Sequence, residues 1–435
     1  MTTQDPLYTD WLHHQTRLQA DSLAVYDLTS QRQFSWQQFH ERVDALAHRL
    51  IADGVQPGER VAYLGLNSSD VLEIFFATLR IGAVYVPLNF RLTPPELSFI
   101  VRDCSPTAIF FDQAFGEVVD AIDESAIPVL TIATALNGSP STYEKYLMWD
   151  EMEMNPAPVN GDTLSMIMYS SGTTGKPKGI MYTRRMIFAA AMNIFQSSEI
   201  DSDSLLLNVM PLFHIGGMQF VLMAVKAGIP LLMMRSFDPT EMLSVIDNPQ
   251  LGVTNIGGVP AMWSAMSHSP KVDDIDYTRI RVAATGAESV PEPMLKEWLT
   301  RGITLQEVYG MTESSGVVCI AQKSDLPEHM GYAGRALPYS DIKIMKSETQ
   351  EAATGELGEI WMRGACVTPG YWNRSDATRD AFVGDWLKSG DIGRMDSMGR
   401  LSVEDRIKDM YISGGENVYP AEVESVLLAH PEIRE

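Results

Sequence analysis

Residues 164–179 read LSMIMYSSGTTGKPKG, and this stretch decides the fold because an apolar run leads directly into a loop suited to an anion. The run 164–169 predicts a buried strand. The ten residues after it include three glycines, whose backbone freedom lets successive N–H groups converge on one anion. The hydroxyls of Thr173 and Thr174 add donors, and two lysines add positive charge. We therefore predict a polyphosphate-binding loop at the end of a strand.

This loop differs from a Walker A loop. In the pattern G-x-x-x-x-G-K, the position of the first glycine is Ser170 here, and Pro177 follows Lys176 where Ser or Thr is required. A solvated Gly/Ser linker is the structural alternative. Such a linker rarely follows a buried strand or carries lysines at this spacing, so we favour the phosphate loop.

On both sides of the loop, short apolar runs typical of strands alternate with helical stretches. The strand-like runs are 60–66, 83–89, 108–112, 128–132 and 230–234. The stretch 68–82 is typical of a helix that ends at Gly82. This alternation predicts an α/β fold with helix-covered, mainly parallel sheets.

The pattern changes after about residue 330. Closely spaced β-like runs with Gly and Pro turns, such as GELGEIWMRG at 355–364, predict a small antiparallel, barrel-like subdomain over about 330–400. We place one domain at 1–405, and the hinge with an incomplete α+β C-terminal domain at 406–435. A strand, a glycine loop and one helix beginning at Pro420 cannot bury a core alone.

Composition excludes several classes of protein. An apolar share of 45% in 435 residues argues against disorder, and a net charge of −23 argues against nucleic-acid binding. Three separated cysteines suit a reducing cytosol, and we expect a cytoplasmic protein without a signal peptide. The apolar stretch 220–234 is interrupted and too short to span a bilayer. Peripheral membrane contact and a homodimer stay open, and the 25 methionines fit either core filling or a lipophilic pocket.

Further motifs follow the loop in a fixed order. They are Pro211–Gly217, Thr285–Glu288, Tyr309–Glu313, Trp386–Asp391, Asp405–Asp409 and Ser413–Asn417. With the loop, this set resembles the adenylate-forming superfamily of acyl-CoA synthetases, luciferases and peptide-synthetase adenylation domains, over nearly the whole chain. The resemblance is strongest to the fatty-acyl-CoA ligases.

The resemblance implies an acid-thiol ligase that works in two steps. A carboxylate attacks the α-phosphate of ATP with Mg²⁺, giving acyl-AMP and pyrophosphate, and the thiol of CoA then displaces AMP. Three alternatives remain: an aromatic-acid CoA ligase, an acyl-AMP ligase that passes the acyl group to a carrier protein, and an inactive nucleotide-binding fragment.

The resemblance also implies roles for particular residues. The catalytic positions are Thr173, Lys178, His214, Thr312 and Glu313. The nucleotide-binding positions are Ser170, Ser171, Gly172, Thr174, Gly175, Lys176, Gly286, Ala287, Glu288, Tyr309, Gly310, Met311, Asp391 and Arg406. Among these, Glu313 is the implied Mg²⁺ ligand, Tyr309 the adenine platform and Asp391 the ribose ligand. Read locally, the same residues fit a surface carboxylate, a core tyrosine and a turn aspartate.

The positions of the implied acyl pocket are mostly small or apolar residues. They are His214, Gly216, Gly217, Met218, Gly258, Val259 and Met262. No Asp or Arg is among them to hold a second charged group, so we expect a hydrophobic acid rather than an amino acid. The local alternative for His214 is a satisfied core histidine.

The end of the chain carries the implied hinge at Lys408 and the CoA tunnel at Gly414 and Gly415. The adenylation lysine of the superfamily lies further along the C-terminal domain, and no position up to Glu435 matches it. We therefore expect residues 1–435 to bind ATP or AMP weakly and to adenylate slowly.

Overall fold

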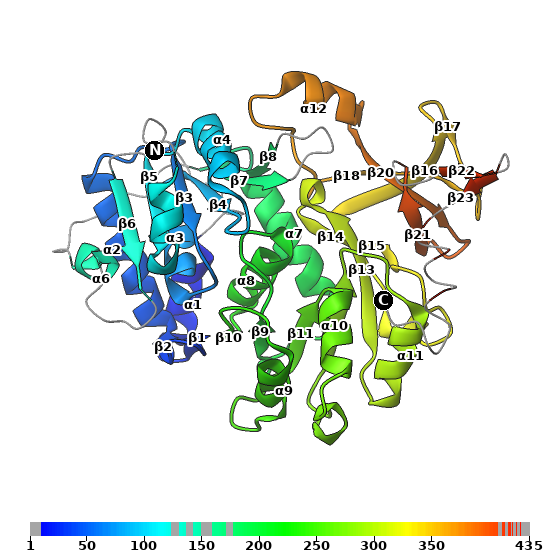
Figure 1. Ribbon diagram of the computed structural model, residues 1–435, viewed down its shortest axis with the longest axis horizontal. Coiled ribbons are helices and arrows are strands. Elements are labelled where there is room, and N and C mark those ends of the chain that lie inside the picture. The colour runs from blue at the N-terminus through cyan, green and yellow to red at the C-terminus, as the bar shows by residue number, and fades with distance from the viewer. Residues whose placement is uncertain are drawn as a thin grey trace. The chain divides into compact units, whose positions relative to one another are not determined.

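The computed structural model describes residues 10–122, 130–135, 142–148, 159–170 and 177–407, with a few backbone positions between 411 and 427. These residues form two compact units. Unit 1 comprises Met1–Ala191, Leu206–Ser236 and Thr368–Ala377, and unit 2 comprises Met192–Leu205, Phe237–Val367 and Thr378–Glu435. Each unit is described by itself (Figure 1).

A six-stranded sheet forms the centre of unit 1. Its strand order is β6-β5-β3-β4-β7-β8, and all neighbours are parallel except β7 and β8. The strands are β3 (Arg60–Leu64), β4 (Val84–Leu88), β5 (Ala108–Asp112), β6 (Leu130–Thr134), β7 (Leu164–Ser170) and β8 (Lys178–Thr183). The predicted strand before the loop is therefore confirmed, as is the mainly parallel sheet.

Helices cover this sheet. They are α3 (Ser69–Arg80), α4 (Pro94–Cys104), α5 (Gly116–Asp120) with η2 (Gln113–Phe115), and α6 (Thr142–Leu147). Helix α2 (Trp36–Ala52) packs on α3, β1 and β2. The helix predicted at 68–82 is confirmed as α3, and all its residues are buried, the charged Asp70, Glu73 and Arg80 included. The helix ends at Arg80, and Gly82 follows with a positive φ of 73°.

Unit 1 also contains strands in the order β9-β10-β1-β2. They are β1 (Leu23–Asp27), β2 (Arg32–Ser35), β9 (Leu206–Asn208) and β10 (Leu231–Met233), with α1 (Trp11–Gln19), α7 (Arg184–Ser197) and α8 (Ile215–Ala227) as helices nearby in the chain. The apolar stretch 220–234 is thus the end of α8 followed by β10. No described helix is long and apolar enough to cross a bilayer.

Unit 2 begins with a second parallel ladder. Strands β11 (Asn255–Gly258), β12 (Val282–Gly286) and β13 (Leu305–Met311) are parallel, while β14 (Gly316–Ile320) and β15 (Arg335–Ala336) continue antiparallel. The helical elements are α9 (Pro239–Asp247), α10 (Pro260–Ser267), α11 (Glu292–Thr300), η3 (Val272–Asp274), η4 (Thr312–Ser314) and η5 (Lys323–Asp325).

The predicted antiparallel subdomain is confirmed in unit 2. Its strands run β17-β16-β18-β20-β19, with β21 paired to β20. They are β16 (Ser340–Ser347), β17 (Gln350–Glu351), β18 (Gly358–Gly364), β19 (Phe382–Val383), β20 (Trp386–Met395) and β21 (Leu401–Arg406), and α12 (Ser375–Ala381) precedes β19. A separate hairpin joins β22 (Tyr411–Ser413) and β23 (Glu416–Val418). The helix expected from Pro420 lies largely outside the described residues.

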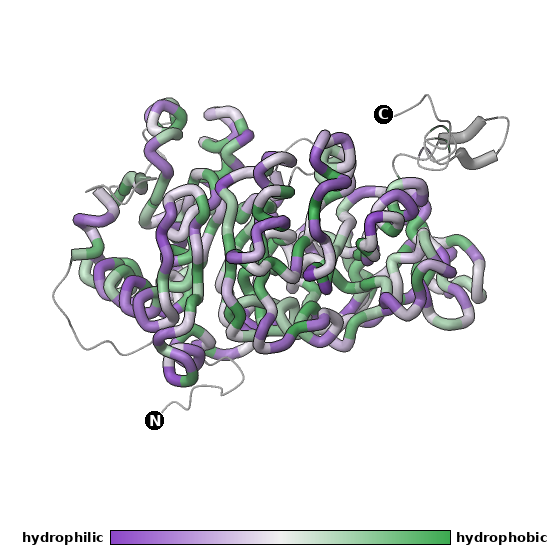
Figure 2. Tube along the Cα trace, turned by 90° about the horizontal axis from the view of Figure 1, so that it is seen from below, coloured by the Kyte–Doolittle hydropathy of each residue, from purple (hydrophilic) through white to green (hydrophobic). Residues whose placement is uncertain are grey.

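The cores are apolar and aromatic. Trp36 in unit 1 and Trp263, Trp298 and Trp361 in unit 2 are almost fully buried. Figure 2 shows hydrophilic and hydrophobic residues alternating along the outer helices, as expected for amphipathic elements. Many methionines, such as the fully buried Met166, fill these cores, and all three cysteines are buried free thiols.

Candidate functional site

Two predicted motifs of unit 2, Thr285–Glu288 and Tyr309–Glu313, and the predicted acyl-pocket positions from Gly258 lie along one edge of its parallel ladder. Gly258 pairs with Thr285 between β11 and β12, and Gly286 pairs with Val308 between β12 and β13. The carboxyl ends of these strands therefore lie side by side, where open α/β sheets bind ligands. The register brings together segments that are separate in the sequence.

Two of the predicted residues, Tyr309 and Asp391, are hydrogen-bonded to each other. The Tyr309 hydroxyl donates to Asp391 Oδ2 at 2.7 Å, and the Asp391 amide donates to Ser389 Oγ at 2.9 Å. Tyr309 is 8% exposed, and burial, followed by the charge of Asp391, raises its pKa well above the ordinary value. The hydroxyl therefore stays a donor at neutral pH. The aromatic ring and the carboxylate are held as one pair, which the motifs alone do not reveal.

Arg406 is the cross-strand neighbour of Asp391, but its side chain stays beyond hydrogen-bond distance of the Asp391 carboxylate. Asp391 pairs with Arg406 in the ladder of β20 and β21, yet Arg406 Nε is 3.6 Å from Asp391 Oδ1. The Arg406 side chain is 59% exposed. Solvent screens such an ion pair, so its contribution to stability is small.

The turn after β13 places Glu313. Gly310 is required there, because a Cβ would come within 1.8 Å of the Gly316 carbonyl oxygen. Ser314 Oγ accepts from the Met311 amide at 3.0 Å, which closes η4. Glu313 is 9% exposed in this turn, directly after Thr312.

The segment after β12 has an unusual backbone. Ala287 has a positive φ of 74°, a conformation that costs a non-glycine residue about 1–3 kcal/mol. Ala287 and Glu288 are both exposed at the end of the strand. Such conformations persist where the surroundings impose them, and they concentrate at ligand sites.

In unit 1, the phosphate-loop motif is placed by the ends of two paired strands. Ser170 at the end of β7 pairs with Lys178 at the start of β8. The Lys178 ammonium lies 5.2 Å from the centre of the Tyr371 ring, within cation–π range. The loop positions between these ends lie outside the described residues, as do the hinge and tunnel positions. They are Ser171, Gly172, Thr173, Thr174, Gly175, Lys176, Lys408, Gly414 and Gly415.

His214 is the N-cap of α8 and remains exposed. Its ring centre is 4.3 Å from that of Phe213. Partial desolvation and, after it, the charge of Arg91 lower the pKa of His214. The imidazole is therefore neutral at pH 7, and it is no satisfied core histidine.

The other predicted acyl-pocket positions divide between the units. In unit 1, Gly217 is required because a Cβ would lie 2.4 Å from the Pro211 carbonyl oxygen, while Met218 is fully buried. In unit 2, Gly258 ends β11 and Met262, on α10, is 8% exposed. Val259 is the N-cap of α10.

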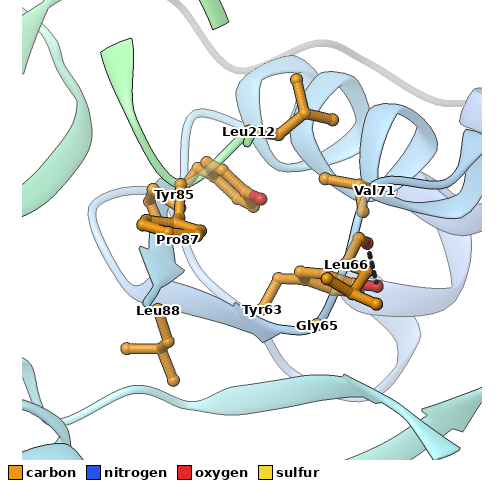
Figure 3. A pocket seen from close by; sticks show the side chains of 9 residues that line it. Tyr63, Gly65, Leu66, Val71, Tyr85, Pro87, Leu88 and Leu212 are labelled. Atoms are coloured by element: carbon orange, nitrogen blue, oxygen red, sulfur yellow. Dashed lines mark hydrogen bonds between the residues drawn. The ribbon is translucent and has the colours of Figure 1, made fainter. Parts of the chain in front are cut away.

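A small enclosed cavity lies next to the His214 motif in unit 1 (Figure 3). It is lined by Tyr63, Gly65, Leu66, Val71, Tyr85, Pro87, Leu88, Leu212 and Phe213. Its volume of about 10 Å³ holds about one water molecule. Tyr63 donates to the Leu66 carbonyl at 3.3 Å, whereas the buried Tyr85 hydroxyl has no partner among the described residues. A water would satisfy it, and the cavity is too small for an acyl group.

The chain was compared with known proteins. Residues 12–372 match the family described as AMP-binding enzyme. The chain is 33% identical to indoleacetate–CoA ligase of Aromatoleum aromaticum, over 98% of this chain and 84% of that protein. It is 35% identical to the long-chain-fatty-acid–CoA ligase FadD13 of Mycobacterium tuberculosis, over 91% of this chain and 78% of that protein.

A solved structure agrees with these matches. The o-succinylbenzoate CoA synthetase MenE of Bacillus subtilis, in complex with its acyl-adenylate intermediate OSB-AMP, superposes with a TM-score of 0.86 at 29% identity. The match covers 100% of this chain and 84% of that one.

Proposed function

Because this chain belongs to the AMP-binding enzyme family, within the adenylate-forming superfamily, we propose that it joins a hydrophobic carboxylic acid to CoA through an acyl-adenylate. It is an AMP-forming acid–CoA ligase by family, and ATP and CoA are the co-substrates of that family. The hydrophobic acid, the acceptor and the residue roles below are our proposals.

One observation carries this proposal: the hydrogen-bonded pair of Tyr309 and Asp391 at the edge where β12 and β13 end. An aromatic face beside a carboxylate suits a nucleoside, since the ring can stack on the base and the carboxylate can accept from both ribose hydroxyls. Arg406, exposed and not closed onto Asp391, adds positive charge near the same place. Gly286, Ala287 and Glu288 would border the base from β12.

The turn after Tyr309 fits a magnesium nucleotide. Magnesium in nucleotide sites is usually held by one or two carboxylates together with the phosphates. Glu313 is such a hard oxygen donor on a short turn, and no cluster of three or more metal-ligating side chains occurs among the described residues. We assign Glu313 to Mg²⁺, which would neutralise phosphate charge, and Thr312 to a hydrogen bond with the α-phosphate.

Unit 1 would supply the polyphosphate and acyl positions. Lys178 carries its charge at the base of the phosphate loop, which runs from Ser170. His214, neutral and exposed at the start of α8, would border the acyl group without adding charge. Gly216 beside it has only the Met210 side chain near its missing Cβ, at 3.6 Å, so it adds no bulk next to an apolar group. A fatty acid fits these positions, and FadD13 is named for such a substrate.

An aromatic acid is the second candidate. The relative from Aromatoleum aromaticum is named for indoleacetate and covers nearly all of this chain. Gly258, Val259 and Met262 offer a small apolar wall that a planar ring would also fit.

ATP–pyrophosphate exchange across a panel of aliphatic, aromatic and amino acids tests the function. We expect exchange that depends on Mg²⁺ and is fastest with apolar acids. Exchange with aromatic acids alone would select the second candidate. Exchange with amino acids alone would contradict the hydrophobic pocket, and a chain that binds neither ATP nor AMP in calorimetry would overturn the proposal.

Glu313→Gln tests the metal assignment. The amide keeps the shape of the side chain but loses the charge, so we expect the Mg-ATP-dependent rate to fall about 100-fold. The free energy of unfolding should change by less than about 0.5 kcal/mol, measured in urea. A rate equal to that of the unmodified chain would remove Glu313 from the metal role.

A further inference from the structure

Asp103, in the last turn of α4, joins three segments of unit 1. Its Oδ2 accepts from the Tyr169 hydroxyl at 2.7 Å, and its Oδ1 accepts from Arg374 Nη2 at 2.7 Å. Its backbone oxygen accepts from the Trp372 indole at 3.1 Å. The Asp103 side chain is only 10% exposed, so both contacts to the carboxylate are charge-assisted and partly shielded from water.

Tyr169 connects this cluster to the phosphate-loop motif. It is the penultimate residue of β7, and the next residue, Ser170, is the first of the motif. Burial beside the Cys104 thiol, followed by the hydrogen bond to Asp103 and the charge of that carboxylate, raises the pKa of Tyr169 above its ordinary range. The hydroxyl therefore stays protonated and keeps donating to Asp103.

Strand β8, which follows the loop, is hydrogen-bonded to the segment that contains Arg374. The Gly179 carbonyl, one residue into β8, accepts from the Trp372 amide at 2.7 Å. Further along, the Met181 amide donates to the Gly370 carbonyl at 3.1 Å. Strand β8 is thus bonded directly to residues 370–372, and β7 is linked to Arg374 of the same segment through Asp103.

We propose that Asp103, Tyr169 and Arg374 form a positioning clamp that sets where β7 and β8 end, and thereby how tightly the loop between them binds the phosphates of ATP. The three are positioning residues, because none of them needs to touch the nucleotide. This inference rests on the proposed function, since it takes the loop to be the ATP phosphate site.

The physical reason is preorganisation. A ligand that must order its own binding loop loses affinity in proportion to the entropy of ordering. Fixed strand ends reduce that loss before ATP arrives. A weakened clamp should therefore raise the KM for ATP and leave the KM for the acid and the kcat nearly unchanged.

Unit 1 offers a matched control. Tyr146 on α6 donates to Asp53 at 2.6 Å, and Arg49 Nε lies 3.1 Å from the same carboxylate. Helix α6 packs on β6, at the opposite edge of the sheet from β8. Tyr146→Phe therefore removes the same hydroxyl–carboxylate contact far along the sheet from the loop.

The experiment compares Tyr169→Phe with Tyr146→Phe in the full chain, using calorimetry for the Kd of ATP and exchange kinetics for KM and kcat. We expect Tyr169→Phe to weaken ATP binding about tenfold, with the KM for the acid within about twofold. Tyr146→Phe should leave both constants within about twofold. The Asp103 variants should follow the order Asn milder than Ala, because the Asn oxygen still accepts from Tyr169.

The outcomes separate the clamp from the function on which it rests. Equal ATP affinity in Tyr169→Phe and the unmodified chain, or equal losses in the two Tyr variants, would overturn the clamp while leaving ATP binding intact. Parallel changes in the KM for ATP and for the acid would show general damage and overturn it too. An unmodified chain that does not bind ATP would overturn the proposed function, and the clamp with it.

Discussion

Tyrosine, aspartate and arginine meet in both units, and their geometry differs in an instructive way. In unit 1, Arg374 contacts Asp103 at 2.7 Å and the carboxylate is 10% exposed. In unit 2, Arg406 stays 3.6 Å from Asp391, whose carboxylate is 15% exposed. The arginines differ more, since Arg406 is 59% exposed and Arg374 is 34% exposed. The tyrosine contact is 2.7 Å in both. The closed trio of Asp103, Tyr169 and Arg374 suits a structural joint. The open trio of Asp391, Tyr309 and Arg406 suits a ligand site, because its more exposed and more distant arginine can turn toward a ligand.

The largest expected effect concerns the open trio. Asp391→Asn should weaken ATP binding about 100-fold, since hydrogen bonds from the ribose hydroxyls to a charged group contribute about 1.5–3 kcal/mol each. Calorimetry measures this change. In the unmodified chain 2′,3′-dideoxy-ATP should bind as weakly as ATP binds to Asp391→Asn.

The control for that prediction measures the binding of dideoxy-ATP to the Asp391→Asn variant. If Asp391 reads the ribose, then dideoxy-ATP should lose little further affinity in Asp391→Asn. Additive losses would mean that Asp391 acts elsewhere, and the contrast between the two trios would lose its functional meaning.

An intermediate effect is expected at the closed trio. Arg374→Ala leaves the mostly buried Asp103 carboxylate without its cation, which should lower the free energy of unfolding by about 2 kcal/mol in urea titration. The double variant Arg374→Ala with Asp103→Asn should recover part of this loss, because the unpaired charge is gone. A loss below about 0.5 kcal/mol would show that the closed geometry contributes little.

The smallest effect is expected for Arg406→Ala. The ion pair of Arg406 with Asp391 is long and exposed, so its loss should lower the free energy of unfolding by less than about 0.5 kcal/mol. The substitution should weaken ATP binding only about threefold. That threefold difference should vanish at 0.5 M salt, where the Debye length falls to about 4–5 Å. A salt-independent loss of more than tenfold would mean that Arg406 closes onto the ligand.

The sequence predicted more of the fold than of the contacts within the site. Strand β5 was predicted at 108–112, and it spans Ala108–Asp112. The strand predicted at 60–66 ends earlier, at Leu64, where the chain turns toward α3. The stretch 230–234 contributes only Leu231–Met233 to a strand, since short apolar runs do not mark their own ends.

For the candidate site, too, the sequence predicted residues but not the contacts between them. Tyr309, Asp391 and Glu313 were predicted from the motifs, but the hydrogen bond between Tyr309 and Asp391 was not, and neither was the role of Ser389 in orienting Asp391. The one available signal for Ser389 was its position two residues before Asp391 in WLKSGD, a spacing typical of a local turn.

By itself, the sequence determined what depends on neighbours in the chain: the alternation of strands and helices, and the glycine-rich stretch after β7. These follow from periodicity and from the backbone chemistry of glycine. Only the tertiary structure decided which Asp meets which Tyr. Asp103 lies 66 positions from Tyr169 and 271 from Arg374, and no local pattern specifies a contact across such distances, because strand order and register create it.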